Sequence, residues 1–360
     1  MIRARAYTLL LLLTVALPAQ TVYPGKEWER ARPEDSGYSS KRFAALSAYL
    51  ATIDTTAMVV VHQGKVVFEY GDLTRQSYLA SVRKSILAML YGKYVASGKI
   101  NLDATLEELG MDDVGGLLPV EKKAKVRHLI TARSGVYHPA SYPGDDLAQA
   151  PPRGTQTPGS YHLYSNWDFN AAGFVFEKLT GRDVYDALET DLAEMIGMQD
   201  FNRSLQKKAG NAEVSKYPAY PMWLTTRDMA RIGYLMLRKG KWRDQQVVSS
   251  EWIKTITSLV TPVYDMNPPS RRGYANGTLW GYGYMWWVWD DHNRSGPFQG
   301  AYSGFGAVGQ YITVLPALDL VVAHKTVPAE RGQPPRGVTS EQYHSILIQT
   351  INARCGKTCP

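Results

Sequence analysis

The chain has 360 residues, of which 44% are hydrophobic and 11% aromatic, so it can bury a large core as one large domain or as two joined lobes. Its 40 basic and 33 acidic residues leave a net charge of +7, and no basic tract is present, so a nucleic-acid partner is not implied. No internal repeat or low-complexity segment is visible.

The first twenty residues, MIRARAYTLLLLLTVALPAQ, have the composition of a secretory signal peptide. Two arginines precede an apolar run over 9–17 that is too short for a comfortable transmembrane span. No cysteine follows the run, so a lipid anchor is not expected. We expect residues 1–19 to be removed by cleavage near Ala19, and the mature protein to be periplasmic or secreted without a stable membrane anchor.

The next segments predict a helix and a pair of strands. Residues 39–52 have helical periodicity, and 57–71 contains two stretches of β-branched and aromatic residues on either side of Gln63-Gly64. Such stretches around a short turn are typical of a β-hairpin.

The stretch LASVRKSILAML (79–90) places a lysine one helical turn after a serine on an otherwise apolar segment. If 81–97 is a helix, Ser81 and Lys84 share a face, with Cβ atoms about 5–6 Å apart. Because burial lowers the pKa of a lysine, Lys84 is a candidate base and Ser81 the hydroxyl that it would activate. The alternative is an N-cap serine, the commoner role at a helix start. The same spacing at Ser204 and Lys207 lies in a polar stretch that we expect to be a solvated surface loop.

The middle of the chain, from about 100 to 240, predicts short helices and loops and ends in the helical pattern TTRDMARIGYLMLRKG. Proline and glycine are dense over 136–160, which indicates a long irregular loop near a site.

A nucleophile–lysine pair needs a third group that moves a proton to the leaving atom. Tyr164 is the candidate, with Asn166 two residues later, because an amphipathic helix over 167–180 holds this loop in place. Tyr274 and Asn276 repeat the spacing in a polar stretch that we expect to be an exposed turn. Tyr164 could equally be one of the chain's 23 tyrosines, packed between lobes.

Three late stretches have strand character, namely WGYGYMWWVWDD (280–291), GQYITVLP (309–316) and LDLVVAHKTV (318–327). The last two predict a hairpin, and a terminal helix is expected over about 339–353. With the two early strands, they predict one sheet built from both ends of the sequence, and the helical middle forms a second lobe.

Metal and cofactor sites are not expected. GFGAVG (304–309) matches a dinucleotide fingerprint, but a strand follows it, so no helix N-terminus is available for a pyrophosphate. The histidines show no metal-binding spacing, and His138 and His162 are expected to have surface or packing roles. Cys355 and Cys359 predict a small disulfide at the C-terminus of an exported protein.

In order along the chain, Ser81-Val-Arg-Lys84, Tyr164-Ser-Asn166 and a glycine-rich strand at 300–312 resemble the serine β-lactamase and penicillin-binding-protein-like hydrolase family. The resemblance is greatest to its branch of class C β-lactamases, esterases and 6-aminohexanoate-dimer hydrolases. Further matching stretches are VRHLITARSGVYHP (126–139), WLTTRDMARIGYLML (223–237) and GYGYMWW (281–287).

The resemblance spans about 40–350 and implies an α/β fold of the β-lactamase/transpeptidase type, an antiparallel sheet flanked by helices plus a helical lobe. After an N-terminal extension over 20–38, the hydrolase domain would cover 39–354, before a C-terminal tail at 355–360. The implied division places the α/β lobe at about 39–100 and 245–354, and the helical lobe at about 101–244.

The resemblance also implies roles for the matching residues. Ser81 would be the acylated nucleophile and Lys84 its base or proton relay. Tyr164 would be the acid and base for the leaving group and water, and Asn166 would hydrogen-bond Lys84 and the substrate.

An oxyanion hole would need two amide donors. The amide of Ser81 lies at the positive end of the helix dipole and suits this role. The second donor would be the amide of Gly304, with Ser303 as the alternative. β-Lactamases carry Lys-Thr-Gly on that strand, whereas this chain has 301–303, Ala-Tyr-Ser, and the similar Lys325-Thr-Val lies one strand later without the glycine.

The sequence therefore predicts an exported serine hydrolase that cleaves an ester or amide of a small molecule through an acyl-enzyme on Ser81, without a cofactor. Because the strand lysine is missing, we expect neutral esters to be better substrates than β-lactams. One alternative is a β-lactamase or D-Ala-type peptidase that acts on cell-wall-like substrates. Another is a non-catalytic cell-wall-binding relative, although a binder has no need for Ser81, Lys84 and Tyr164 together.

Aromatic residues near the late strands suggest an apolar or aromatic acyl pocket, or else belong to the core: Trp280, Trp286, Trp287, Trp289 and Tyr302. The physiological substrate, the oligomeric state and the choice of Lys84 or Tyr164 as acylation base stay open at this stage.

Overall fold

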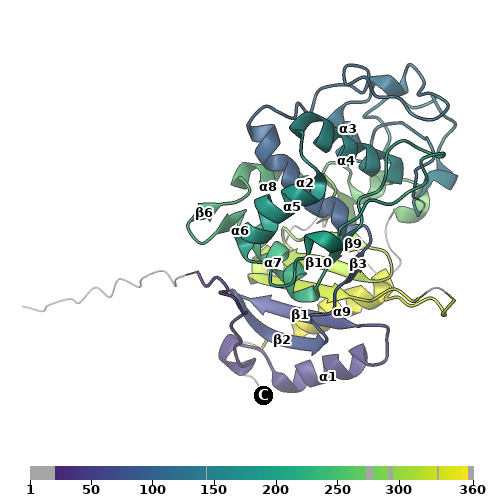
Figure 1. Ribbon diagram of the computed structural model, residues 1–360. Coiled ribbons are helices and arrows are strands. Elements are labelled where there is room, and N and C mark those ends of the chain that lie inside the picture. Colours follow the sequence, from purple (N-terminus) through teal and green to yellow (C-terminus); the bar gives the residue numbers. More distant parts are fainter. Residues whose placement is uncertain (1–20, 143, 273–278, 291–294, 331, 356–360) are drawn as a thin grey trace, which may run out of the picture.

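The computed structural model describes residues 21–355 except 143, 273–278, 291–294 and 331 (Figure 1). Its main sheet is antiparallel, with strand order β2-β1-β11-β10-β9-β8-β7. The strands of this sheet are β1 (Ala57–His62), β2 (Lys65–Gly71), β7 (Trp280–Tyr282), β8 (Trp287–Trp289), β9 (Tyr302–Gly306), β10 (Gln310–Leu315) and β11 (Leu320–Lys325).

The prediction of one sheet with strands from both ends of the chain is confirmed. β1 pairs with β11 from Ala57 opposite Lys325 to His62 opposite Leu320. The late strands differ from the prediction, since 280–291 and 300–312 each contain two strands rather than one. The turn between β7 and β8 and the turn between β9 and β10 both contain residues with positive φ, for example Gly309 (φ 95°). A strand cannot continue through this left-handed conformation, so each stretch is divided into two strands.

Two small two-stranded sheets lie outside the main sheet, one from distant segments and one a hairpin, and helices and loops make up the rest of the described chain. The two sheets are β3 (Ser77–Leu79) with β4 (Met222–Leu224), and β5 (Lys241–Trp242) with β6 (Gln245–Gln246). The α-helices are α1 (Ser40–Leu50), α2 (Val82–Ala96), α3 (Val126–Ile130), α4 (Asn166–Thr180), α5 (Val184–Leu188), α6 (Glu194–Ile196), α7 (Thr226–Leu237), α8 (Ser250–Ile256) and α9 (Ser340–Asn352).

The sheet lies between two helical layers. In Figure 1, α1 and α9 lie below it and α7 lies on the opposite side. Helix α7 contacts β1, β10 and β11 of the sheet, and it also contacts α6 of the region that the sequence division assigns to the helical lobe. Its close approach to the sheet depends on Gly233, where a Cβ would lie only 2.5 Å from Val321 Cγ1.

Helix α2 connects the two parts of the molecule. It contacts α4, α5 and α8 on one side and β9 and β10 on the other. Most of its residues are buried, including Lys84 at 1% exposure. The start of α2 therefore lies at the boundary between the sheet and the helical region (Figure 1).

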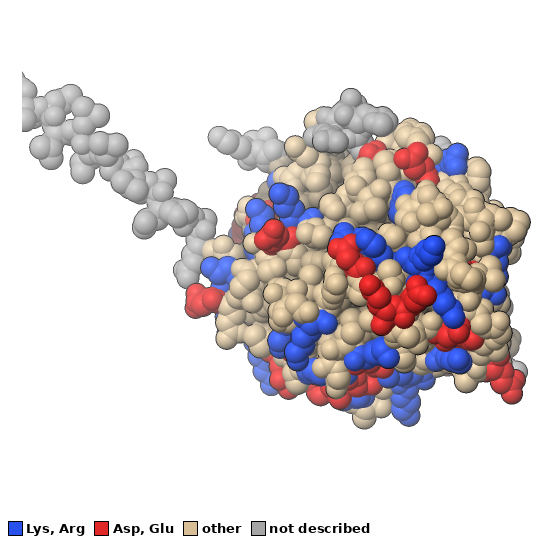
Figure 2. Space-filling model, turned by 90° about the horizontal axis from the view of Figure 1, so that it is seen from above, with Lys and Arg blue, Asp and Glu red and all other residues tan. Residues whose placement is uncertain are grey.

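On the face shown in Figure 2, basic and acidic side chains are interspersed. None of the helices in the described part of the chain is long and apolar enough to cross a membrane. Cys355 is disulfide-bonded, and its predicted partner Cys359 lies outside the described residues.

Candidate active site

Ser81 lies between β3 and α2, at the N-cap position of the helix. Its hydroxyl makes no capping hydrogen bond and instead accepts one from Lys84 Nζ at 3.0 Å. The N-cap alternative is therefore right about the position of Ser81 but not about its hydroxyl. That hydroxyl faces the lysine one turn later.

Lys84 is buried among the other predicted site residues. Its Nζ lies 2.6 Å from the Tyr164 hydroxyl and 2.6 Å from Asn166 Oδ1, and it sits 4.2 Å from the centre of the Tyr164 ring. Burial, and after it the charge of Arg83, holds the pKa of Lys84 well below its usual value, although Asp145 and Asp146 act in the opposite direction. Burial therefore favours the neutral amine of Lys84 over the ammonium.

The loop before α4 positions Tyr164 and Asn166. The backbone N–H of Asn166 donates to Asp145 Oδ2 at 2.8 Å, and the backbone N–H of Asp146 donates to the Tyr164 carbonyl oxygen at 3.1 Å. Burial raises the pKa of Tyr164 to about 12, against the lowering effect of its hydrogen bond with Ser81. Tyr164 thus keeps its proton at neutral pH and can donate it.

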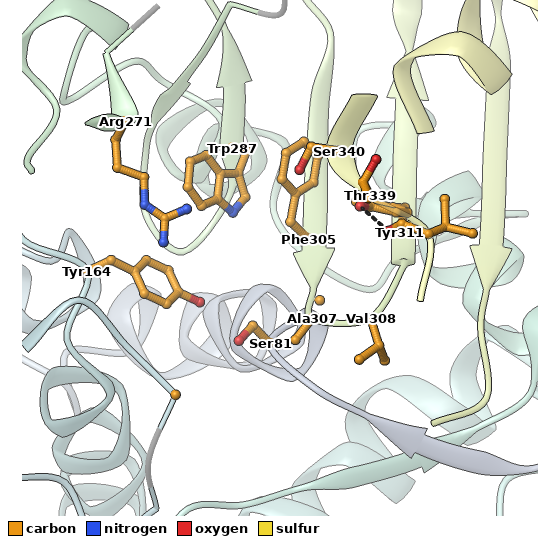
Figure 3. Close-up of a pocket in the computed structure, with 13 residues that line it drawn as sticks. Ser81, Tyr164, Arg271, Trp287, Phe305, Ala307, Val308, Tyr311, Thr339 and Ser340 are labelled. Carbon is orange, nitrogen blue, oxygen red and sulfur yellow. Dashed lines mark hydrogen bonds between the residues drawn. The ribbon is translucent and has the colours of Figure 1, made fainter. Parts of the chain in front are cut away.

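An open pocket of about 460 Å³ lies above these residues (Figure 3). Ser81 and Tyr164 line it, while Lys84 and Asn166 lie behind them. The remaining lining residues are Gly144, Arg271, Trp287, Phe305, Gly306, Ala307, Val308, Tyr311, Val338, Thr339 and Ser340. The predicted nucleophile therefore faces a space that can hold a small molecule.

The predicted oxyanion residues on β9 require a correction. Ser303 is fully buried, and its hydroxyl contacts Thr313 Oγ1 at 2.7 Å within the sheet. A Cβ on Gly304 would lie 3.0 Å from Ser85 Oγ, so Gly304 packs against α2. The pocket lies beyond the end of β9, where Ala307 is beside Ser81 (Figure 3). The amide of Ala307 is thus the better candidate for the second donor.

Arg271 lines the pocket. Its Nε and Nη2 donate to Asp146 Oδ2 and Oδ1 at 3.0 and 2.9 Å. Lys325 faces elsewhere, because its buried Nζ donates to the carbonyl oxygens of Ser77 and Leu224. The similar Lys-Thr-Val sequence at 325–327 therefore supplies no cation to this pocket.

Both alternatives for the five aromatic residues are represented, since all five belong to the core or pack against it and Trp287 also reaches the pocket. Trp287 lines the pocket, whereas the lining described for this pocket does not include Trp280, Trp286, Trp289 or Tyr302. Two other aromatic residues contribute, since Phe305 stacks on Trp287 with ring centres 5.2 Å apart and meets Tyr311 edge to face. Phe305 and Tyr311 lie on β9 and β10, whose register the sequence pattern did not predict.

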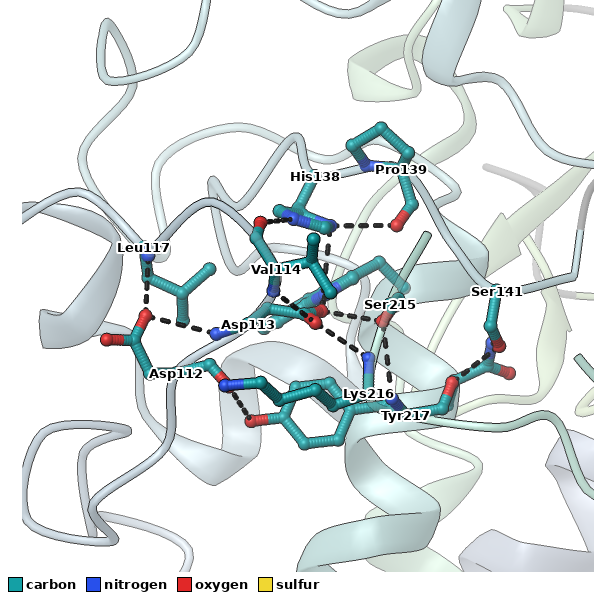
Figure 4. Close-up of polar contacts among 12 residues, drawn as sticks. Asp112, Asp113, Val114, Leu117, His138, Pro139, Ser141, Ser215, Lys216 and Tyr217 are labelled. Carbon is teal, nitrogen blue, oxygen red and sulfur yellow. Dashed lines mark hydrogen bonds and ion pairs between the residues drawn. The ribbon is translucent and has the colours of Figure 1, made fainter. Parts of the chain in front are cut away.

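The two histidines pack away from this pocket, as expected. His138 contacts the carbonyl oxygens of Val114 and Pro139, each at 2.8 Å, within a network centred on Asp113 (Figure 4). Trp167 Nε1 donates to the same Asp113 at 2.7 Å, so this network anchors the start of α4. His162 is buried with neither ring nitrogen hydrogen-bonded.

The remaining sequence candidates give no second site. Ser204 is exposed and bonds to its neighbour Asn202, whereas Tyr274 and Asn276 lie outside the described residues. In the described part of the chain, no group of His, Cys, Asp and Glu side chains could hold a metal ion. The dinucleotide-like motif at 304–309 spans the end of β9 and the following turn, and β10 follows it, so the prediction of a strand rather than a helix after the motif is confirmed.

Comparisons with known proteins agree with this arrangement. The family model described as Beta-lactamase matches residues 43–326. The structure is similar to a putative 6-aminohexanoate-dimer hydrolase from Bacillus anthracis, with a TM-score of 0.63 and 20% identity over 91% of this chain and 86% of that chain. It is also similar to a putative beta-lactamase from Bacteroides dorei DSM 17855, with a TM-score of 0.62 and 15% identity over 88% and 99% of the two chains.

A family VIII carboxylesterase is a third structural neighbour, with a TM-score of 0.60 and 13% identity over 91% of this chain and 99% of that chain. At these identities the structural likeness establishes the fold, and the family model covers all strands of the main sheet and the helices from α2 to α8.

Proposed function

The chain belongs to the beta-lactamase family of serine hydrolases, and on that premise we propose that it cleaves an ester or amide bond of a small molecule through an acyl-enzyme on Ser81. One observation carries the proposal. The buried Lys84 Nζ lies 3.0 Å from the Ser81 hydroxyl and 2.6 Å from the Tyr164 hydroxyl, directly beneath an open pocket.

In the acylation step, neutral Lys84 takes the proton of Ser81 as Oγ attacks the carbonyl carbon of the substrate. The amides of Ser81 and Ala307 stabilise the oxyanion that forms. Tyr164 donates its proton to the leaving atom as the bond to that atom breaks, and Lys84 returns a proton to Tyr164. The opposite pKa shifts of the two residues favour Lys84 as the base and Tyr164 as the acid.

Deacylation runs the same relay in reverse, with water in place of the leaving group. The water loses a proton through Tyr164 to Lys84, its oxygen attacks the acyl carbon, and Ser81 leaves with a proton from Lys84. Asn166 Oδ1, 2.6 Å from Nζ, accepts one hydrogen of the neutral amine, so the single lone pair and the second hydrogen of Lys84 are left for the hydroxyls of Ser81 and Tyr164.

A second candidate function is the hydrolysis of β-lactams or D-Ala-type peptides, which carry a carboxylate. Arg271 in the pocket lining favours it, because a guanidinium can bind a carboxylate in a bidentate manner. However, Asp146 already balances this charge. We therefore retain neutral esters and amides as the first candidates, and the close approach of Ser81, Lys84 and Tyr164 argues against a binding protein without activity.

We also propose that the protein is exported. The composition of residues 1–19 alone supports this part of the proposal. N-terminal sequencing of the protein recovered from culture medium or periplasm should give a start near Gln20, and an intact Met1 on the recovered protein would contradict it.

The decisive experiment is active-site labelling with a fluorophosphonate probe, followed by peptide mapping. We expect the label on Ser81, and Ser81→Ala should abolish labelling without loss of the folded state. Ser204→Ala is the matched control, because Ser204 has the same spacing to a lysine but an exposed hydroxyl. Label on another serine, or no label on folded protein, would refute the assignment.

The substrate class is then tested with a panel of p-nitrophenyl esters, short linear amides and a chromogenic cephalosporin. We expect kcat/KM for the neutral esters to exceed that for the cephalosporin. The reverse order would replace the first candidate function with the second.

A further inference from the structure

The chain that leads into Ser81 is connected to the main sheet by a side chain. β3 pairs with β4 in a separate two-stranded sheet, so it is not a strand of the main sheet. Between the end of β3 and Ser81 lies a single residue, Ala80. The packing of α2 on β9 and the contacts of β3 with β10 and β11 together set the position of the nucleophile relative to β9.

Gln310, the first residue of β10, connects this strand to the segment before Ser81. Its side chain is fully buried, and its Oε1 accepts a hydrogen bond from the backbone N–H of Ala80 at 2.6 Å. Its Nε2 donates to the carbonyl oxygen of Tyr78 at 2.9 Å. The amide group thus pairs with the backbone at 78 and 80 as a neighbouring strand would.

The backbone of Gln310 pairs with the end of β9, which leads to Ala307, the second candidate amide donor of the oxyanion hole. Gln310 is the ladder partner of Gly306, which precedes Ala307. A Cβ on Gly306 would lie 2.9 Å from Gln310 Oε1 and 3.0 Å from Gln310 Cβ, so the absence of a side chain at 306 leaves room for the glutamine side chain. Gln310 therefore contacts the residue immediately before each of the two candidate amide donors.

We propose that Gln310 is a positioning residue that holds the Ser81 and Ala307 amides, and the Ser81 hydroxyl, in the geometry needed for acyl transfer. The inference rests on the proposed function. Gln310 does not line the pocket that the described residues form, so it acts only through the backbone that it binds. Small displacements of reacting groups are costly, since a 1 Å misplacement can lower a rate about 100-fold.

The test compares Gln310→Ala with Thr313→Val on a p-nitrophenyl ester. Thr313 is an equally buried polar residue of β10, but its hydroxyl contacts Ser303 and Tyr343 rather than the segment before Ser81. We expect Gln310→Ala to lower kcat by about ten- to a hundredfold with little change in KM. Thr313→Val should lower the melting temperature to a similar extent and keep kcat near the wild-type value.

A conservative variant sharpens the test. Gln310→Glu keeps an oxygen for the Ala80 N–H but loses the amide donor to Tyr78, so its kcat should lie between those of the wild type and Gln310→Ala. The labelling rate of Ser81 by the fluorophosphonate should follow the same order, since it depends on the same geometry.

The inference is refuted if the folded Gln310→Ala variant keeps the wild-type kcat. It is also refuted if Thr313→Val, at the same loss of melting temperature, lowers kcat as much as Gln310→Ala does. These outcomes differ from a failure of the proposed function. In that case the wild-type protein itself is not labelled at Ser81, and no nucleophile is present for Gln310 to position.

Discussion

Two buried lysines, Lys84 on α2 and Lys325 at the end of β11, are each 1% exposed, and burial lowers the pKa of both. Lys84 contacts the hydroxyls of Ser81 and Tyr164, which can exchange protons with it, beneath a pocket. Lys325 contacts backbone carbonyl oxygens, which only accept hydrogen bonds. A lowered pKa alone does not make a lysine a base, because it also needs partners that exchange protons and access to substrate.

The largest expected effect comes from changing Lys84. Lys84→Arg keeps the positive charge but cannot deprotonate, so kcat should fall by about 10²–10⁴-fold, nearly as far as in Lys84→Ala. Lys325→Met should lower the melting temperature while Ser81 is still labelled. An active Lys84→Arg variant would show that Lys84 acts only through its charge and that Tyr164 is the base.

Arg271 extends the comparison to a cation that does reach the pocket. If it binds substrate carboxylates, Arg271→Ala should lower kcat/KM for a cephalosporin by about ten- to a hundredfold, since a charge-assisted hydrogen bond contributes about 1.5–3 kcal/mol. Neutral p-nitrophenyl esters should be hydrolysed at a nearly unchanged rate. Equal losses on both substrates would indicate that Arg271 supports the pocket through Asp146 rather than binding substrate.

Substitutions of Arg83 test whether its charge contributes to the lowered pKa of Lys84. Arg83 is buried, its guanidinium lies 4.5 Å from the centre of the Tyr220 ring, and its charge is the second cause of the lowered pKa. Activity should fall on acidification, when Lys84 becomes protonated in the free enzyme. Arg83→Met removes the neighbouring charge, so the pKa of Lys84 rises and the acid limb of kcat/KM moves to higher pH.

The matched control is Arg83→Lys, which keeps a positive charge and should leave the acid limb close to that of the wild type. An unmoved limb in Arg83→Met would show that burial alone sets the pKa of Lys84.

The smallest expected effect is the contribution of Lys325 to the pH dependence of the unfolding free energy. Burial lowers its pKa from 10.5 to about 7, so between these values the unfolded chain binds a proton that the folded protein does not. Unfolding free energy should therefore rise with pH from about 7 towards 10.5. Urea unfolding at several pH values should show a flatter profile for Lys325→Met, and an equally steep profile would exclude Lys325 as the source.

Short-range patterns in the sequence were sufficient for part of the site. The three-residue spacing of Ser81 and Lys84 on a helix brings their side chains together, because 3.6 residues per turn place them on one face. The start of α4 after Tyr164, the early hairpin and the β10–β11 hairpin also followed from local patterns. The family resemblance then brought Tyr164 to Lys84, a contact between residues 80 positions apart.

Only the tertiary structure decided the rest of the site. It placed Ala307 rather than Gly304 beside Ser81, because the register of β9 against α2 determines which peptide reaches the pocket. It brought Arg271 into the lining and directed Lys325 to β3 and β4. Backbone geometry determines which residues meet within one turn or hairpin, whereas contacts between distant segments depend on packing across the whole core, which no local pattern encodes.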